Sequence, residues 1–125
     1  MTTIILPGLV LPSGNIRERL HWGARHRLGK RCRLALLTAG AAILDGQLKL
    51  MAPAKRRLII TRVGGRVMDA VNLGFAIKPL EDAIRDRGWL VDDSPTWCEL
   101  DVRQRPRFRG ECAGYVVQIE DCENA

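Results

Sequence analysis

Acidic, amide and lysine side chains recur at short spacing in the second half of this chain. Carboxylates are hard oxygen ligands, and Mg²⁺ prefers one or two of them together with waters and phosphate oxygens. A lysine nearby neutralises the charge that develops on a phosphorus centre. The spacing therefore indicates phosphodiester chemistry at a divalent metal. The residues concerned are Asp69, Asn72, Lys78, Asp82, Asp92 and Asp93.

The carboxylates of this set predict the metal site. Asp69 and Asp93 would together hold one Mg²⁺, and Asp92 is a further candidate ligand. The metal would lower the pKa of a bound water and polarise the scissile phosphate. Val71 is a gap in the pattern, because it stands where a second carboxylate would fit beside Asn72.

The remaining side chains of the set take supporting roles. Lys78 would contact the phosphate and offset its negative charge. Asn72 would orient an acid or a metal-bound water, as groups behind the ligands do. Asp82, four residues after Lys78, would hold the lysine in place.

Purely structural interpretations of the same residues stay open. Asp69 is a suitable helix N-cap, because its side chain accepts from unpaired backbone N–H groups. The segment 92–95, Asp-Asp-Ser-Pro, has the composition of a turn. Lys78 and Asp82 have the spacing of an ordinary helical ion pair, which contributes about 0.3 kcal/mol.

Charge is segregated along the chain. Residues 1–68 hold thirteen Lys or Arg against two acids, whereas residues 69–125 hold seven against twelve. This distribution predicts a basic face for a polyanion and an acidic centre for a metal. Arginine dominates the basic half, and its planar guanidinium suits phosphate. The residues expected to follow a DNA backbone are Arg17, Arg19, Arg25, Arg27, Lys30 and Arg31.

Hydrophobic periodicity predicts the elements that position these side chains. We expect one α/β (α+β) domain over residues 1–125, with a mixed sheet and two main helices in the order β-α-β-α-β-β. Pro79 should kink or divide the second helix. Trp22 is expected to pack at a helix start. The expected ranges are a strand in 3–11, a helix over 16–44, a strand in 53–63, a helix over 69–87, strands over 97–104 and 113–120, a mobile basic loop at 105–111, and a frayed acidic tail at 121–125.

Length and composition restrict the class of protein. A chain of 125 residues with 46% hydrophobic residues forms one globular domain. The apolar opening at residues 3–11 is too short for a membrane span and has no basic stretch before it, so we expect a cytoplasmic protein. Four cysteines without C-x-x-C spacing predict free thiols.

Four blocks of residues, in this order over residues 11 to about 104, resemble the RusA-like Holliday junction resolvases, especially the small versions common in phages and prophages. The asparagine–lysine–aspartate block with the following Asp-Asp is the more specific part. The blocks are Leu11-Pro12-Ser13-Gly14-Asn15, His21-Trp22-x-x-Arg25-x-Arg27-x-x-Lys30, Asp69-x-x-Asn72-Leu73-x-x-x-x-Lys78-Pro79-Leu80-x-Asp82-Ala83, and Asp92-Asp93-Ser94-Pro95.

The resemblance implies a homodimer that binds four-way DNA junctions and cuts symmetric strands with Mg²⁺ or Mn²⁺. Its catalytic acids would fall on Asp69 and on the pair Asp92-Asp93, and its lysine on Lys78. The family usually has an acid where this chain has Val71. Two alternatives therefore accompany the endonuclease: a resolvase-derived junction binder that cleaves poorly or not at all, and a basic protein-interaction module.

Overall fold

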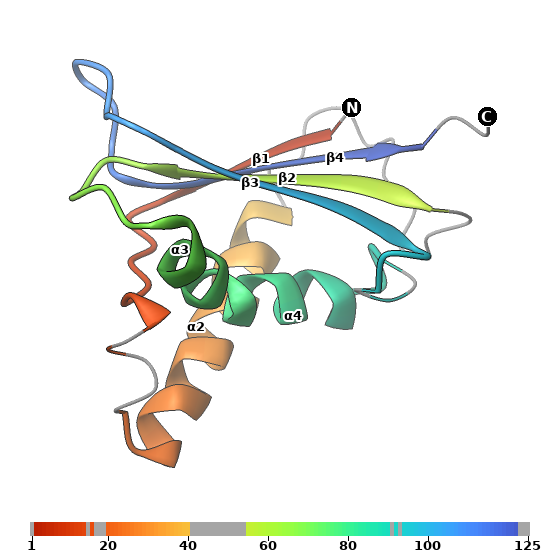
Figure 1. Ribbon diagram of the computed structural model, residues 1–125, viewed down its shortest axis with the longest axis horizontal. Coiled ribbons are helices and arrows are strands. Elements are labelled where there is room, and N and C mark those ends of the chain that lie inside the picture. The colour runs from red at the N-terminus through yellow and green to blue at the C-terminus, as the bar shows by residue number, and fades with distance from the viewer. Residues whose placement is uncertain are drawn as a thin grey trace.

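Seven helices and strands make up the part of the chain that the structure describes. This computed structural model describes residues 2–14, 16, 20–40, 55–90, 92 and 94–122 (Figure 1). A mixed sheet with two helical segments confirms the predicted α+β class and the predicted order of elements. The elements are β1 (Thr2–Pro7), α2 (Trp22–Gly40), β2 (Arg56–Val63), α3 (Ala70–Ala76), α4 (Lys78–Asp86), β3 (Cys98–Arg105) and β4 (Gly114–Asp121).

The four strands lie in the order β1-β4-β2-β3. β4 is antiparallel to both of its neighbours, whereas β2 and β3 are parallel. Parallel neighbours need a long crossover connection, usually helical, and α3 with α4 provides it here. The register places Ile60 opposite both Val102 and Val117.

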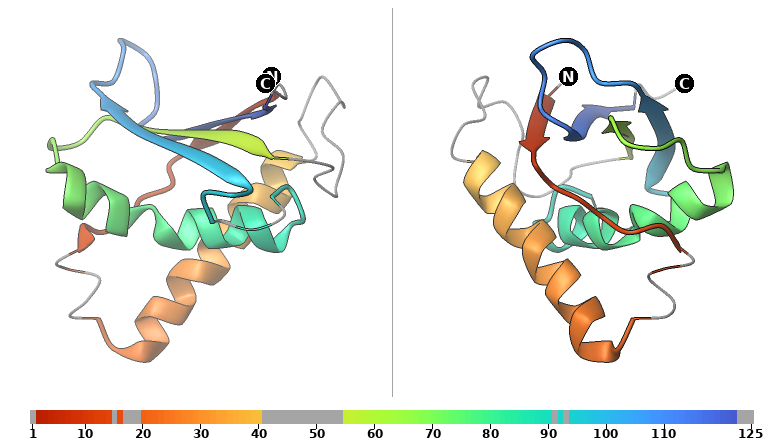
Figure 2. Two further views of the ribbon diagram at one scale, coloured as in Figure 1. Left: turned by 45° about the vertical axis from the view of Figure 1, so that its right-hand side comes forward. Right: turned by 90° about the vertical axis from the view of Figure 1, so that its left-hand side faces the viewer.

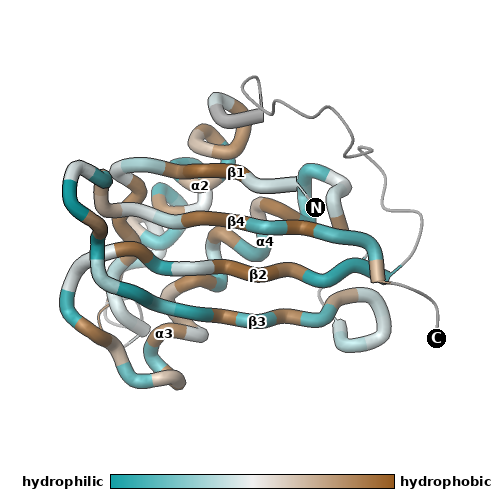
Figure 3. The backbone as a smooth tube through the Cα atoms, turned by 90° about the horizontal axis from the view of Figure 1, so that it is seen from above, coloured by the Kyte–Doolittle hydropathy of each residue, from teal (hydrophilic) through white to brown (hydrophobic). Residues whose placement is uncertain are grey.

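One face of the sheet is covered by the helices (Figure 2). Burial alternates along β1, as expected for a strand with one face on a core. Side chains such as Ile4, Ile60 and Val117 point from the sheet into this core. In the described part of the chain no helix covers the opposite face, onto which Figure 3 looks. There Arg57 lies 3.6 Å from Asp101 and 3.7 Å from Glu120.

The long helix α2 buries a narrow apolar stripe. Leu28, Cys32 and Leu36, spaced four residues apart, are all buried, as expected for the core-facing side of a helix. The helix begins at Trp22 and not at residue 16, because His21 ends the preceding segment as a cap: its Nδ1 accepts from the Gly23 N–H at 3.2 Å. Residues 17–19 and 41–44 of the predicted helix lie outside the described part.

The second predicted helix is divided in two, as Pro79 led us to expect. α3 ends and α4 begins at Ile77, which is the C-cap of α3 and the N-cap of α4. Proline lacks the N–H that would continue the hydrogen-bond ladder, so it stands in the first turn of α4. The buried side of these two helices carries Leu73, Ile77, Leu80 and Ile84.

Two expectations about the ends of elements are wrong. Trp22 does not pack into the domain; it is 74% exposed and stacks on His26, with ring centroids 5.3 Å apart. Asp121 belongs to β4 and not to a frayed tail. Its carboxylate accepts from the buried guanidinium of Arg56 at 2.8 Å. Residues 123–125 lie outside the described part.

All four cysteines are free, as predicted. Cys32 and Cys98 are buried, Cys122 is half-buried and Cys112 is exposed. None of the helices described within residues 2–122 combines the length and the apolar composition needed to cross a membrane.

Candidate functional site

Asp69 is the N-cap of α3, and Asn72 is its partner. The backbone N–H of Asn72 donates to Asp69 Oδ1 at 2.9 Å, and Asn72 Nδ2 donates to Oδ2 at 2.7 Å. These hydrogen bonds lower the pKa of the exposed Asp69 carboxyl below its usual range. The structural interpretation of Asp69 as a cap is therefore confirmed. Each oxygen keeps a second lone pair, so the capped carboxylate can still accept from a ligand.

Gly14 brings the N-terminal segment against this pair. A Cβ atom at Gly14 would lie 2.6 Å from the Phe75 Cβ and 3.3 Å from Asn72 Oδ1. No side chain fits in that space, so glycine allows the backbone to pass beside Asn72. In the sequence, Gly14 stands out only as a member of the block Leu11-Pro12-Ser13-Gly14-Asn15, and nothing in that pattern indicated a contact with α3.

The start of α3 is fastened to the end of β3. Met68 N–H donates to Gln104 Oε1 at 3.0 Å, and Gln104 Nε2 donates to the Met68 carbonyl at 2.6 Å. This reciprocal pair places Asp69, the next residue after Met68, beside the last residues of β3.

Lys78 forms the predicted helical ion pair. Its Nζ lies 3.4 Å from Asp82 Oδ1 and 3.9 Å from the carboxylate of Glu81. Arg85 also approaches Asp82, at 3.8 Å. The ion pair expected from the spacing of Lys78 and Asp82 is therefore present on a half-exposed side of α4, and a supporting role for Asp82 at the phosphate stays a prediction.

The structure does not bring Asp92 to Asp69. Ser94, two residues after Asp92, accepts from the Trp97 and Cys98 N–H groups and so lies at the start of β3. Asp69 lies at the end of β3. A strand rises about 3.3 Å per residue, so the six steps from Cys98 to Gln104 separate these positions by roughly 20 Å. Asp93 lies outside the described part of the chain.

This separation bears directly on the predicted metal site. Across the described residues, there is no group of three or more His, Cys, Asp or Glu side chains that could hold a metal ion. Asp69 contributes one carboxylate, and its neighbour Asn72 is an amide. Asp92, the further candidate ligand, therefore does not join Asp69 in one site within a single chain. The predicted pair of Asp69 with Asp93 stays a prediction, because Asp93 lies outside the described part.

Several arginines lie at the same end of the sheet as Asp69. The sequence did not predict that they would share one surface. β2 and β3 are parallel, so their last residues are neighbours, and the Gly64 N–H donates to the Arg105 carbonyl at 2.9 Å. Figure 1 shows the β2–α3 loop, the β3–β4 loop and α3 together at its left end. We call this region the arginine end; its members are Arg62, Arg66, Arg105, Arg107 and Arg109.

The basic helix α2 is the surface that the sequence did predict. No acidic residue occurs between Trp22 and Gly40. Arg33 pairs with Asp86 of α4 at 3.7 Å. Predicted DNA-contacting side chains that are exposed on this helix are Arg25, Arg27, Lys30 and Arg31. Arg17 and Arg19 lie outside the described part.

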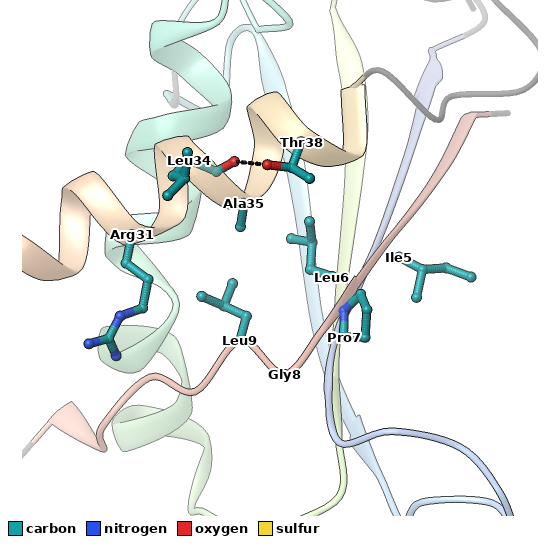
Figure 4. A pocket seen from close by; sticks show the side chains of 9 residues that line it. All are labelled: Ile5, Leu6, Pro7, Gly8, Leu9, Arg31, Leu34, Ala35 and Thr38. Atoms are coloured by element: carbon teal, nitrogen blue, oxygen red, sulfur yellow. Dashed lines mark hydrogen bonds between the residues drawn. The ribbon is translucent and has the colours of Figure 1, made fainter.

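An apolar groove of about 470 Å³ lies between β1 and α2 (Figure 4). The Thr38 hydroxyl donates to the Leu34 carbonyl at 3.0 Å, and Arg31 lies at one edge of the groove. The lining residues are Ile5, Leu6, Pro7, Gly8, Leu9, Arg31, Leu34, Ala35 and Thr38. They include no acid and no nucleophile for catalysis, so the groove takes no part in the candidate chemistry.

Comparisons with known proteins were made at the level of family, sequence and fold. No family model, no curated protein and no solved structure matches this chain. What the protein does is therefore inferred from its own residues and their geometry.

Proposed function

We propose that this protein binds branched DNA, such as a four-way junction. The observation that carries the proposal is α2, a helix of 19 residues with five Lys or Arg side chains and no acid. A helix with exposed cations along one side neutralises phosphates and releases their counterions, which gives affinity with little base specificity.

Two further features support DNA as the partner. The arginine end adds a second group of cations at the end of the sheet, and three of them, Arg105, Arg107 and Arg109, come from the half of the chain that is acidic overall. Trp22 and His26 also form an exposed stacked pair at the start of α2. Exposed aromatic rings beside cations are typical of proteins that bind nucleic acid by stacking and charge together. A protein-interaction module remains the alternative from another class.

Phosphodiester cleavage with Mg²⁺ or Mn²⁺ is the second function that we propose, and a specific observation favours it. Asp69 is exposed, its pKa is lowered, and it shares one end of the molecule with arginines that attract phosphate. Within the described residues no three metal-binding side chains gather, and Asp92 lies near the opposite end of β3. The missing acid would come from a second copy, in line with the homodimer that the resemblance implies.

Reversal of charge on α2 tests the binding proposal. The double variant Arg27→Glu/Lys30→Glu should lose binding of a labelled four-way junction, measured by fluorescence anisotropy at several salt concentrations. A matched double variant, Lys55→Glu/Arg85→Glu, makes the same change of charge just before β2 and on α4, and should bind like the parent. Equal binding by the α2 variant and the parent at moderate salt would overturn the proposal.

The assembly and location are part of the same proposal. A four-way junction is two-fold symmetric, so paired contacts need two copies related by a dyad. We propose a homodimer in the cytoplasm. Light scattering at micromolar protein, with and without DNA, should give twice the mass of one chain; a monomer under both conditions would contradict the dimer.

A further inference from the structure

The hairpin between β3 and β4 is built around one carboxylate. Glu111 accepts from both terminal nitrogens of Arg105 at 2.7 Å, and it also accepts from the Phe108 N–H at 3.0 Å. The bidentate pair fixes the geometry as well as the charge. The loop was predicted to be mobile, but these contacts tie its tip to its base.

The contacts of Glu111 hold an aromatic ring, Phe108, in solvent. The Arg105 guanidinium lies 4.2 Å from the centroid of the Phe108 ring, so one side of the ring is covered by a cation. Phe108 is nevertheless 62% exposed. A large apolar ring held in the open, with its backbone fixed, is available for a planar partner at little further cost in entropy.

Two arginines flank the ring. Arg107 and Arg109 are exposed, and no acid of the described residues pairs with either. Glu111, the acid closest in sequence, is already used by Arg105. The tip therefore presents the order cation, aromatic ring, cation to solvent, which suits a nucleobase between two phosphates.

The hairpin also lies at the end of the molecule that carries Asp69. A Cβ atom at Gly64 would lie 3.5 Å from the Arg107 Cβ, so the hairpin lies close to the loop that leads to α3. Gln104, which holds Met68, stands one residue before Arg105. A DNA branch bound at Asp69 would thus be within reach of the tip.

We infer that Phe108 recognises the branch point itself, by stacking on a base pair that has lost a stacking neighbour there, while Arg107 and Arg109 contact the adjoining phosphates. The inference rests on the proposed function and adds to it. The cations on α2 contact phosphates, which are present in linear and branched DNA alike. An aromatic ring reads an exposed base face, which a branch offers and the interior of a duplex does not.

The test compares two DNA molecules at one salt concentration: a four-way junction, and a linear duplex whose ends are closed by loops so that no terminal pair is exposed. Phe108→Ala should weaken binding of the junction about tenfold, the range of one lost base–aromatic stack. Binding of the closed duplex should not change. Trp97→Ala, an exposed aromatic at the start of β3, is the matched control and should keep the parent's preference.

The flanking arginines give an independent readout. Arg109→Ala should weaken the binding of both DNA molecules. It should also reduce the steepness of the plot of log affinity against log salt concentration by about 0.9. Arg85→Ala removes the same charge from α4 and should leave the slope as it is. Benzoylphenylalanine placed at position 108 should cross-link to nucleotides at the branch point and not along the arms.

The outcomes separate the inference from the proposed function. If the parent binds neither DNA, or the α2 variant binds as the parent does, the proposed function fails. If the α2 variant loses binding while Phe108→Ala keeps the parent's preference for the junction, only the inference is overturned. Circular dichroism should show the same fold for every variant, because none of the substituted side chains is buried.

Discussion

At the scale of single residues, Asp69 combines two roles that sequence reasoning had treated as alternatives. It caps α3, and its exposed carboxylate faces solvent at the arginine end. A cap is needed wherever a helix begins, so this role alone says nothing about chemistry. Substitutions that keep the cap but remove the charge can separate the two roles.

We expect Asp69→Asn and Asp69→Ala to differ in stability and to agree in activity. Asparagine caps helices as well as aspartate does, whereas alanine does not, so only Asp69→Ala should lower the melting temperature. Both should abolish metal-dependent nicking of a four-way junction if Asp69 takes part in it. Equal, nonzero nicking by the parent and Asp69→Asn would show that Asp69 is only a cap.

Val71 can be replaced without a folding penalty. Its side chain is 67% exposed, so an acid there is not buried. It stands in the first turn of α3, where a negative charge interacts favourably with the helix dipole, by about 0.3–1 kcal/mol. Val71→Asp should therefore unfold at the same or a higher temperature, and should raise any nicking in a Mg²⁺ titration. Val67→Asp, outside the helix and also exposed, is the control and should leave nicking unchanged.

At the scale of elements, the β3–β4 hairpin depends on the ionisation of Glu111. Hydrogen bonds from Arg105 and from the Phe108 N–H lower the pKa of Glu111 to about 2 from an ordinary 4.5. A lowered pKa means that the charged form is favoured by folding, so this contribution is complete above pH 4.5 and is lost as pH falls towards 2. Glu111→Gln removes it at every pH.

The difference in melting temperature between the parent and Glu111→Gln should therefore be largest near neutral pH and should shrink below pH 4.5. Comparing the two proteins at each pH cancels the contributions of other acids, including Asp69 and Asp101, whose pKa values are also lowered. A difference that stays constant down to pH 2 would show that Glu111 does not clamp the hairpin.

Most elements were predictable from local pattern. Hydrophobic periodicity identified α2, and a proline without an N–H identified the break between α3 and α4. The start of α2 was predicted too early, because Ile16 continues the apolar pattern while His21 supplies the actual cap. Trp22 was misjudged for a related reason: its size favours burial, but His26 on its own helix provides a stacking partner in solvent.

At the scale of the whole molecule, the site depends on strand order, which local pattern does not contain. Asp69 and Asp92 are close in sequence, yet α3 and α4 carry the chain back along the sheet before β3 begins. The same parallel pairing of β2 and β3 brings Arg62 and Arg66 beside the hairpin, and so creates the arginine end. The resemblance to RusA-like resolvases stays a prediction, and the junction experiments test it.

The positions of the four thiols offer a way to observe this end of the molecule directly. Burial raises the pKa of Cys32 to about 11, and Cys98 is also buried, so neither should react with a maleimide while the protein is folded. Cys112 is exposed and follows Glu111 in the hairpin. Mass spectrometry should find it modified first. A dye attached there changes no charged residue, and its emission should respond when branched DNA arrives at the hairpin and stay constant when DNA binds only along α2.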